Sequence, residues 1–580
     1  MKNETKKNLI FALGIFIIAI VYTYVRYPML TFENSVKGWN SDHAIFVMMG
    51  EDIKNLVNFP FYYWGGNYLG PLNNTAMVLT QYILNLLSIK QAAILQPEVM
   101  YSISPFAASL TCLWLFFLGT VFWGIAFRRF FNLYESLLAC LLLSVGGGLF
   151  MRTSLRPLAP EVAYLLGAII IWRGALLIES NTKKNQLFFG FIFGFSWWMN
   201  QITVFTLAPV FFYFISQNQY FQELRIRPHI LSRLLLKEDA MGISSIHKGL
   251  KGFLYFLYAL ALINFSLGFL IALIGGVNDH FLGVRVKIHN GVSPMKTSIL
   301  IFVITQILLW FFKGKNAKGK IIGKLTFFLI GTAIGFGPVL IGRIFKLYKK
   351  GYTPHFKLVP IEHLREYWAR LFSDFIPRLL APNETFFIIP LFVMIIFPIA
   401  YSIYRNRQIV GNYLIAMPGK IDKVSILWAI PLFNFVYIFI CERSRDQYAF
   451  RYAILSLPVI AIYFATLHRR IPIKLIATPL TIVACIIFAN AQYKQGQKQI
   501  SSYIMASSHK QKIKILLKSE CEVFFSNYWN TYIYEYFLQH QKRFAVVRGQ
   551  DRTPEKTAIL KASSLKKCDL NEDTFEITEL

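Results

Sequence analysis

The stretch Leu9–Val25, LIFALGIFIIAIVYTYV, decides the fold because it is an unbroken apolar segment without a charged residue. A transmembrane helix needs about 20 mainly apolar residues, and this stretch is close to that length. Lys2, Lys6 and Lys7 precede it, as in a signal peptide, but no convincing small-residue cleavage site follows it. The stretch therefore predicts an uncleaved first membrane helix with a basic N-terminal flank.

Similar apolar stretches recur along the chain and predict about thirteen transmembrane helices in all. After the first, they begin near Ser102, Glu135, Pro157, Leu187, Thr203, Phe253, Ser298, Ile321, Phe386, Ser425, Tyr452 and Ile473. The two shortest are 187–199 and 203–215. This pattern predicts an α-helical polytopic membrane protein.

The composition excludes several other classes of protein. The 580 residues include 60 Lys and Arg against 30 Asp and Glu, yet only 16% are charged and 55% are hydrophobic. Soluble domains carry about 25% charged residues, and a nucleic-acid binder needs a solvated basic surface, so we expect no nucleic-acid partner. The hydrophobicity excludes a disordered chain, and six Cys in this length do not make a disulfide scaffold.

Basic residues predict the orientation, because short cytoplasmic loops are enriched in Lys and Arg. With the N-terminus inside, the inner segments carry 25 basic residues and the short outer loops about eight. An odd number of helices then places the C-terminus outside. The prediction is a transmembrane domain over 1–490, with large outer loops at 31–101 and 346–384, and an outer C-terminal domain over 491–580.

The tail predicts a small α/β appendage. A basic amphipathic stretch at Lys510–Lys518 precedes a short apolar run at Val523–Phe525. A helix-like aromatic stretch, Tyr528–Leu538, and a strand-like run, Phe544–Val547, follow. Cys521 and Cys568 both lie in this tail and would pair if the compartment is oxidising.

Acids are scarce on the predicted outer side, which makes Asp42 prominent. Outside the tail there are thirteen outer carboxylates, and Asp42 closely follows the first span, before the apolar helical stretch Ala44–Met49. One interpretation is that Asp42 only caps this helix. The other is a general base held at the membrane surface. Glu51 and Asp52 are its rivals, but they end the helical stretch, where we expect side chains to face solvent.

An aromatic and glycine-rich run follows at Phe59–Pro71, FPFYYWGGNYLGP. Flat aromatic faces bind sugars and apolar chains, although an interfacial aromatic belt would have the same composition. The candidate substrate-binding residues in this run are Tyr62, Tyr63, Trp64, Asn67 and Tyr68.

This order of features resembles bacterial GT-C glycosyltransferases, which are integral-membrane enzymes that use polyprenyl-phosphate-linked sugars. The resemblance continues at Gly194–Trp198 (GFSWW), Arg451–Pro458 (RYAILSLP) and Phe525–Tyr532 (FSNYWNTY). It includes enzymes similar to protein O-mannosyltransferases and aminoarabinose transferases. It implies a multi-pass protein of the bacterial inner membrane, with the N-terminus cytoplasmic and the C-terminus extracytoplasmic.

The resemblance also implies roles for individual residues. Asp42 matches the catalytic acid, and Glu161 is the nearest equivalent of a second acid. Arg451 matches an arginine that faces the lipid phosphate, with Arg443 and Arg445 nearby, and Trp198 joins the substrate-binding set. The loop before Glu161 has no Asp-x-Asp, so no metal ligand is predicted; Mg²⁺ or Mn²⁺ is left open without being favoured.

These residue types fit one reaction. A carboxylate takes the proton of an acceptor hydroxyl, while arginines stabilise the departing polyprenyl phosphate. With one strongly placed acid, we predict an inverting hexosyl or pentosyl transfer to an extracytoplasmic lipid, glycan or protein. The alternatives are a transporter or lipid-sugar flippase, an O-antigen ligase or polymerase, and a noncatalytic membrane scaffold.

Overall fold

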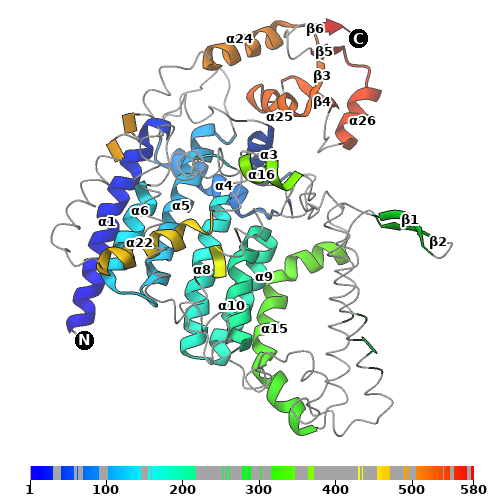
Figure 1. Ribbon diagram of the computed structural model, residues 1–580. Coiled ribbons are helices and arrows are strands. Elements are labelled where there is room, and N and C mark those ends of the chain that lie inside the picture. Colours follow the sequence, from blue (N-terminus) through cyan, green and yellow to red (C-terminus); the bar gives the residue numbers. More distant parts are fainter. Residues whose placement is uncertain are drawn as a thin grey trace.

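The computed structural model describes fifteen continuous parts of the chain, with a few single residues and short pieces between them (Figure 1). These parts are 2–30, 41–57, 69–89, 102–145, 155–157, 160–216, 277–281, 284–288, 315–345, 363–370, 454–470, 505–539, 541–548, 554–570 and 577–579. They are mostly helical and include a bundle, a group of helices above it and a small mixed sheet.

The bundle helices match seven of the predicted spans and part of another. They are α1 (Lys2–Leu30), α5 (Pro105–Phe127), α6 (Leu133–Val145), α8 (Pro160–Glu179), α9 (Lys183–Met199), α10 (Val204–Ser216), α15 (Lys315–Ile344) and α22 (Leu457–Arg470). Among the described residues, three helical segments are long and apolar enough to cross a membrane: Glu4–Pro28, Pro105–Phe127 and Pro160–Glu179. The full number of spans stays a prediction, because most of the remaining stretches lie outside the described residues.

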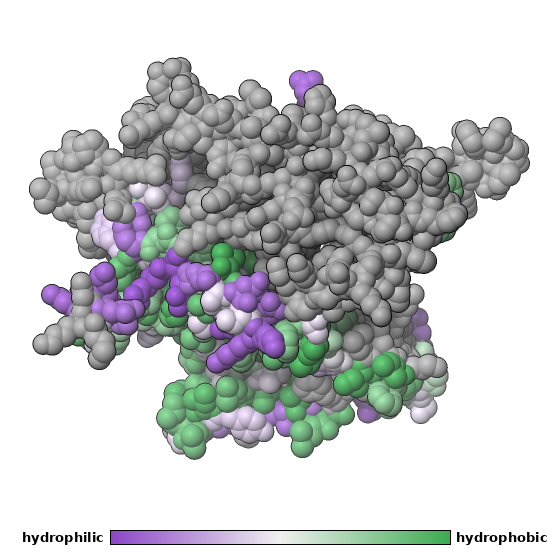
Figure 2. Space-filling model, turned by 90° about the horizontal axis from the view of Figure 1, so that it is seen from below, coloured by the Kyte–Doolittle hydropathy of each residue, from purple (hydrophilic) through white to green (hydrophobic). Residues whose placement is uncertain are grey.

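Helix α1 has two apolar faces, as a lipid-facing helix of a bundle should. Leu9, Leu13 and Phe16 lie on one face and are 60–70% exposed, whereas Phe11 and Ile18 are buried against the bundle. A large apolar stripe of this kind is unfavourable in water but stable in lipid. In the view from below, the described hydrophilic residues form a group on the surface, and described hydrophobic residues lie next to this group (Figure 2).

The sequence fixes several helix starts through local hydrogen bonds. Ser104 caps α5, because its hydroxyl accepts from the backbone N–H of Ala107 at 3.0 Å, and Pro105 occupies the first helical position. Before α6, Asn132 and Glu135 form a reciprocal capping box at 2.9 and 3.0 Å. The buried Glu135 therefore has a structural role.

The predicted inner turns lie together at one end of the bundle. Arg128, just after α5, donates to the Asn8 side chain near the start of α1 at 2.9 Å. Arg129 forms an ion pair with Glu179, the last residue of α8, at 3.3 Å. The start of α1 and the ends of α5 and α8 thus share one end, in agreement with the predicted connectivity.

Helices α9 and α15 cross backbone to backbone. A Cβ added to Gly190 would lie 2.1 Å from the Phe328 carbonyl oxygen, and one added to Gly194 would lie 2.3 Å from the Thr332 oxygen. Gly335 makes the reciprocal approach to the Phe191 oxygen at 2.2 Å. Small residues at four-residue spacing allow this approach in membrane helices. Gly194 of the GFSWW stretch is therefore a packing residue.

Above the bundle lie α3 (Ser41–Lys54) and α4 (Leu72–Leu86), followed by the tail (Figure 1). The tail contains α24 (Met505–Lys518), β3 (Val523–Asn527), α25 (Tyr528–Phe537), β4 (Arg543–Arg548), α26 (Pro554–Ala562), β5 (Lys567–Leu570) and β6 (Ile577–Glu579). One hydrophobic core joins Phe46 and Met49 of α3 to Phe524 and Tyr536 of the tail. The first outer loop and the tail, which the sequence placed on the same side, therefore pack together.

Two further pieces lie elsewhere in the described chain. Strands β1 (Val277–Phe281) and β2 (Val284–Ile288) form an antiparallel hairpin. The short helix α16 (Leu364–Arg370) carries a buried Tyr367 beside a half-exposed Trp368.

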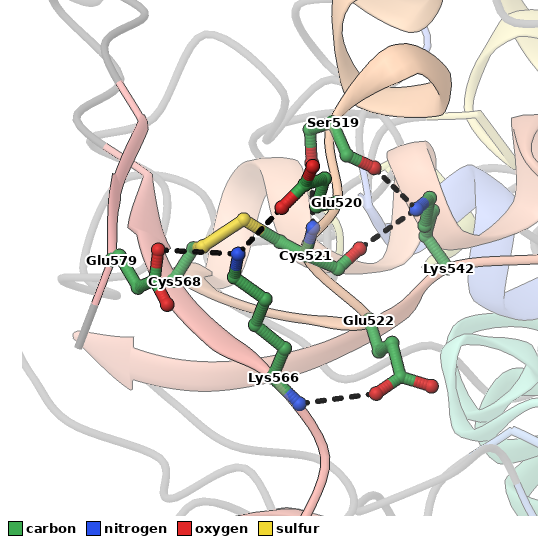
Figure 3. Close-up of polar contacts among 8 residues, drawn as sticks. All are labelled: Ser519, Glu520, Cys521, Glu522, Lys542, Lys566, Cys568 and Glu579. Carbon is green, nitrogen blue, oxygen red and sulfur yellow. Dashed lines mark hydrogen bonds and ion pairs between the residues drawn. A yellow bond between two sulfur atoms is a disulfide. The ribbon is translucent and has the colours of Figure 1, made fainter.

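The tail sheet has the order β4–β3–β5–β6, and β3 is parallel to both of its neighbours. Cys521 and Cys568 form a disulfide that joins the start of β3 to β5 (Figure 3). Beside it, Lys566 forms ion pairs with Glu520 at 2.8 Å and with Glu579 at 3.3 Å, so charges also hold the strands together at this end of the sheet (Figure 3). These contacts raise the pKa of Lys566 and lower that of Glu520.

Candidate functional site

The site is built around the beginning of α3, where Asp42 lies in the first helical turn. A carboxylate there is favoured by the helix dipole. Its side chain is half-buried, and the neighbouring Ser41 and His43 are fully buried. Asp42 is therefore the second residue of α3, inside its first turn, and its neighbours are removed from water.

Helices α3 and α4 run side by side in the same direction. The Asn74 amide donates to the Phe46 carbonyl at 2.5 Å, and the Lys54 ammonium lies 6.0 Å from the Tyr82 ring centroid. Eight residues separate the two contacts on each helix, so the helices share one register. A Cβ added to Gly50 of α3 would lie 3.5 Å from the Asn74 carbonyl oxygen, so the two helices also pack closely between these contacts.

Gly70 ends the aromatic and glycine-rich run and contacts the end of α9. Its backbone N–H donates to the Met199 carbonyl at 2.8 Å, and Leu69 pairs with Asn200 as an isolated bridge. A Cβ on Gly70 would lie 3.0 Å from the Met199 Cα and 3.1 Å from the Trp198 oxygen, so glycine is needed for the approach. The fold thus brings the end of the aromatic run and the GFSWW stretch to one place.

The aromatic side of this junction contains two of the predicted substrate-binding residues. Trp198 is buried in a cluster with Val162 of α8, and the partly buried Tyr62 packs against the same cluster. Phe195 meets Trp198 edge to face, with ring centroids 6.0 Å apart. The ring positions are thereby fixed by packing, which a binding surface requires.

Glu161 lies in the first turn of α8, next to Val162 of that cluster, and is fully buried. Its carboxylate accepts a hydrogen bond from the Cys112 thiol of α5. Cys112 therefore has a polar neighbour in the bundle. A buried carboxylate therefore lies next to the aromatic cluster, and its role as a second acid stays a prediction.

The tail covers α3 with aromatic side chains. The Trp39 ring, just before α3, stacks on His43 at 6.1 Å between centroids and on Tyr536 of α25 at 6.0 Å. The Tyr536 hydroxyl donates to the Ile103 carbonyl at 2.8 Å. The turn that carries Asp42 is thus held by a residue almost five hundred positions further along the chain.

The expectation that Glu51 faces solvent is wrong. Glu51 is only 5% exposed, and its carboxylate accepts from the Ile103 backbone N–H at 3.3 Å and from Gln539 of the tail at 3.5 Å. The reason is that the tail packs over the end of α3, which local sequence does not reveal. Glu51 is a structural link between three segments.

The remaining predicted site residues lie outside the described residues. They are Tyr63, Trp64, Asn67, Tyr68, Arg443, Arg445 and Arg451. The described chain resumes at Ile454, which is buried, and Leu455 packs against Gly167 of α8. Among the described residues, no group of three or more His, Cys, Asp or Glu could hold a metal ion.

The fold and the site define a helical membrane protein with a half-buried carboxylate in the first turn of α3 and a buried aromatic cluster around Trp198. No protein-family model and no curated protein matches the chain. Among solved structures, the chain is similar to the Archaeoglobus fulgidus oligosaccharyltransferase in complex with zinc and sulfate. The identity is 13% and the TM-score 0.43, over 92% of this chain and 62% of the other.

A second similar structure is ArnT from Cupriavidus metallidurans bound to undecaprenyl phosphate. The identity is 11% and the TM-score 0.32, over 94% of this chain and 87% of ArnT. At such low identity and TM-score these likenesses assign no residue, substrate or reaction to this chain, which spans less than two thirds of the oligosaccharyltransferase.

Proposed function

We propose that this protein is a membrane glycosyltransferase. It transfers a hexosyl or pentosyl group from a polyprenyl-phosphate-linked donor to an extracytoplasmic acceptor, which is a lipid, a glycan or a protein. The observation that supports this best is the half-buried Asp42 in the first turn of α3, between the fully buried Ser41 and His43.

In the proposed reaction, Asp42 accepts the proton of the acceptor hydroxyl while the oxygen attacks the anomeric carbon. A carboxylate within hydrogen-bond reach of the acceptor hydroxyl can take up this proton. The bond to the polyprenyl phosphate breaks on the opposite face, so the configuration inverts. Arg451, Arg443 and Arg445 are proposed to stabilise the departing phosphate.

We also propose that 491–580 is an extracytoplasmic domain, that 1–490 spans the bacterial inner membrane, and that the N-terminus is cytoplasmic. The hydrophobic core that joins α3 to the tail supports this arrangement, because two segments that share a core must lie on one side of the membrane. Cysteine pairing in the tail fits an oxidising compartment.

The test compares Asp42→Asn with Asp52→Asn, an acid change ten positions along the same helix. Membranes or purified protein would be assayed with radiolabelled polyprenyl-phosphate sugars. Asp42→Asn should lower transfer by about 10²–10⁴-fold, while Asp52→Asn should stay near wild type. Full activity in Asp42→Asn would exclude the proposed base. Movement of the lipid-linked sugar across the bilayer without transfer would instead favour a flippase.

A further inference from the structure

Helix α4 has its polar and apolar faces reversed relative to a helix that lies in water. Four large apolar side chains, the α4 stripe, are 47–84% exposed and follow the spacing i, i+3, i+4 and i+7 along one face: Leu79, Tyr82, Ile83 and Leu86. The opposite face carries buried polar residues: Asn73, Asn74, Thr80 and Gln81. A stripe of this spacing normally faces a core, so its exposure requires an explanation.

The buried polar face of α4 is bound to the beginning of α5. The Thr80 hydroxyl accepts from the Thr111 hydroxyl at 2.7 Å and from the Trp114 indole N–H at 2.9 Å. The Gln81 side-chain oxygen accepts from the Ser104 backbone N–H at 2.8 Å. These hydrogen bonds fix the rotation of α4 about its own axis, so the α4 stripe is held on the outside.

The same contacts give the depth of α4 along the membrane helix α5. Thr111 and Trp114 follow Pro105, the first residue of α5, by about 9 and 14 Å at a rise of about 1.5 Å per residue. The 23 residues of α5 extend about 34 Å, which is close to the hydrocarbon thickness of about 30 Å. The middle of α4 therefore lies at the depth of the hydrocarbon, in the leaflet that holds the start of α5.

A cation lies beside the α4 stripe, nearer the membrane surface. The Lys54 ammonium is 6.0 Å from the Tyr82 ring centroid and donates to the Ser102 carbonyl, just before α5, at 2.6 Å. Leu56 and Val57, which follow Lys54 closely, are 92% and 73% exposed. A lysine beside a tyrosine, with apolar side chains next to them, is typical of the membrane–water interface.

We propose that the α4 stripe is inserted among the acyl chains of phospholipids in the leaflet that holds the start of α5, with the Lys54 ammonium at the level of the lipid phosphates. Lipid fits better than a second copy of the chain. The stripe is about 12 Å long and about 10 Å wide, whereas a stable dimer buries about 800 Å² on each partner.

This inference goes beyond the proposed function and holds whether or not the chain transfers a sugar. It also has a consequence for α3, because the Asn74 amide of α4 donates to the Phe46 carbonyl of α3. Lipid contact along α4 thereby holds α3 at the membrane surface.

Spin labels on the full chain test the inference, in vesicles of phosphatidylethanolamine and phosphatidylglycerol. Ile83→Cys places a nitroxide in the α4 stripe, and Asn85→Cys places one on an exposed residue outside it. Oxygen concentrates in lipid and a nickel chelate stays in water, so the ratio of oxygen to nickel relaxation should be higher at Ile83→Cys than at Asn85→Cys. Wild type, labelled in parallel, gives the signal of the native cysteines.

A pair of charge variants gives a second measurement in the same vesicles. Ile83→Asp should lower the melting temperature by about 3 °C or more, because a carboxylate is unfavourable among acyl chains. Asn85→Asp introduces the same group outside the α4 stripe and should stay within about 2 °C of wild type.

Three results would overturn the inference. Nickel access at Ile83→Cys equal to that at Asn85→Cys would mean that the α4 stripe faces water. An Ile83→Cys label that neither reagent reaches would mean that protein covers the stripe, either a second copy or another part of this chain. Equal melting temperatures of Ile83→Asp and Asn85→Asp would mean that the stripe has no contact with lipid. A failure to transfer sugar would overturn the proposed function and leave this inference unchanged.

Discussion

The crossing of α9 with α15 and the contact of α3 with the tail hold the molecule together in opposite ways. In the crossing, four glycines let two backbones touch, with no side chain between them. In the contact, large aromatic rings stack and buried polar groups such as Glu51 bridge segments. In lipid the hydrophobic effect hardly favours contact between helices, so close packing of their surfaces stabilises the crossing. Outside the bundle, the hydrophobic effect of water stabilises the aromatic core.

The largest expected loss of stability comes from a variant that tests the close backbone contact between α9 and α15. Gly335→Ala would place a methyl group 2.2 Å from the Phe191 carbonyl oxygen, so the helices must separate. We expect a loss of about 3 kcal/mol in unfolding free energy and a low yield of folded protein. Thermal melting of the purified protein measures this.

The matched control for this change lies two residues away. Gly337→Ala would place its Cβ where nothing lies within 4 Å, so its melting temperature should match wild type. Equal melting of Gly335→Ala and Gly337→Ala would show that the crossing does not depend on close backbone contact.

The second effect concerns the covalent link in the tail. Replacing Cys521 and Cys568 by Ser together removes a disulfide across a separation of 47 residues, which should destabilise the tail by about 3 kcal/mol. Hydrogen exchange should rise in β3, β5 and α3, because α3 shares a core with the tail. Unchanged exchange in α3, or a parallel rise in α9, would contradict the separation of the two regions.

A third effect tests the polar bridge at Glu51. Glu51→Leu would leave the Ile103 N–H and the Gln539 amide without their acceptor, and we expect a loss of about 2 kcal/mol. Glu51→Gln keeps an acceptor oxygen and should lose much less. Thermal melts of the two variants separate these outcomes; equal melting would mean that the bridge adds nothing.

The smallest effect comes from the exposed charges at Lys566. Its raised pKa means that its stabilising charge is present below the usual lysine pKa and is lost only as the pH rises past the raised value. The lowered pKa of Glu520 means that its contribution is lost as the pH falls through that value.

Lys566→Met should therefore shift the melting temperature only slightly at pH 7. The shift should shrink in strong salt and vanish in acid, once the carboxylates are protonated. Melting curves across pH and salt check this, and a shift that persists in acid would mean that the lysine stem, rather than its charge, matters.

Local sequence patterns predicted many of the individual helices and strands of the structure. The length of the apolar stretches predicted α1, α5, α6, α8, α9 and α10, and the order of residue types in the tail predicted β3, α25 and β4. Asp42 could be selected because acids are rare and its position follows the first span. The residues Gly70, Glu51 and Tyr536 could not be selected, since their roles depend on partners more than a hundred positions away.

The sequence by itself determined that this protein is helical and lies in a membrane, because hydropathy and charge act through each segment alone. It also determined which acid to examine. Only the tertiary structure decided that α3 and α4 run parallel, that Gly70 meets Met199, and that the tail buries Glu51. Such contacts depend on how distant side chains fit together, and that fit has no signature in the local order of residues.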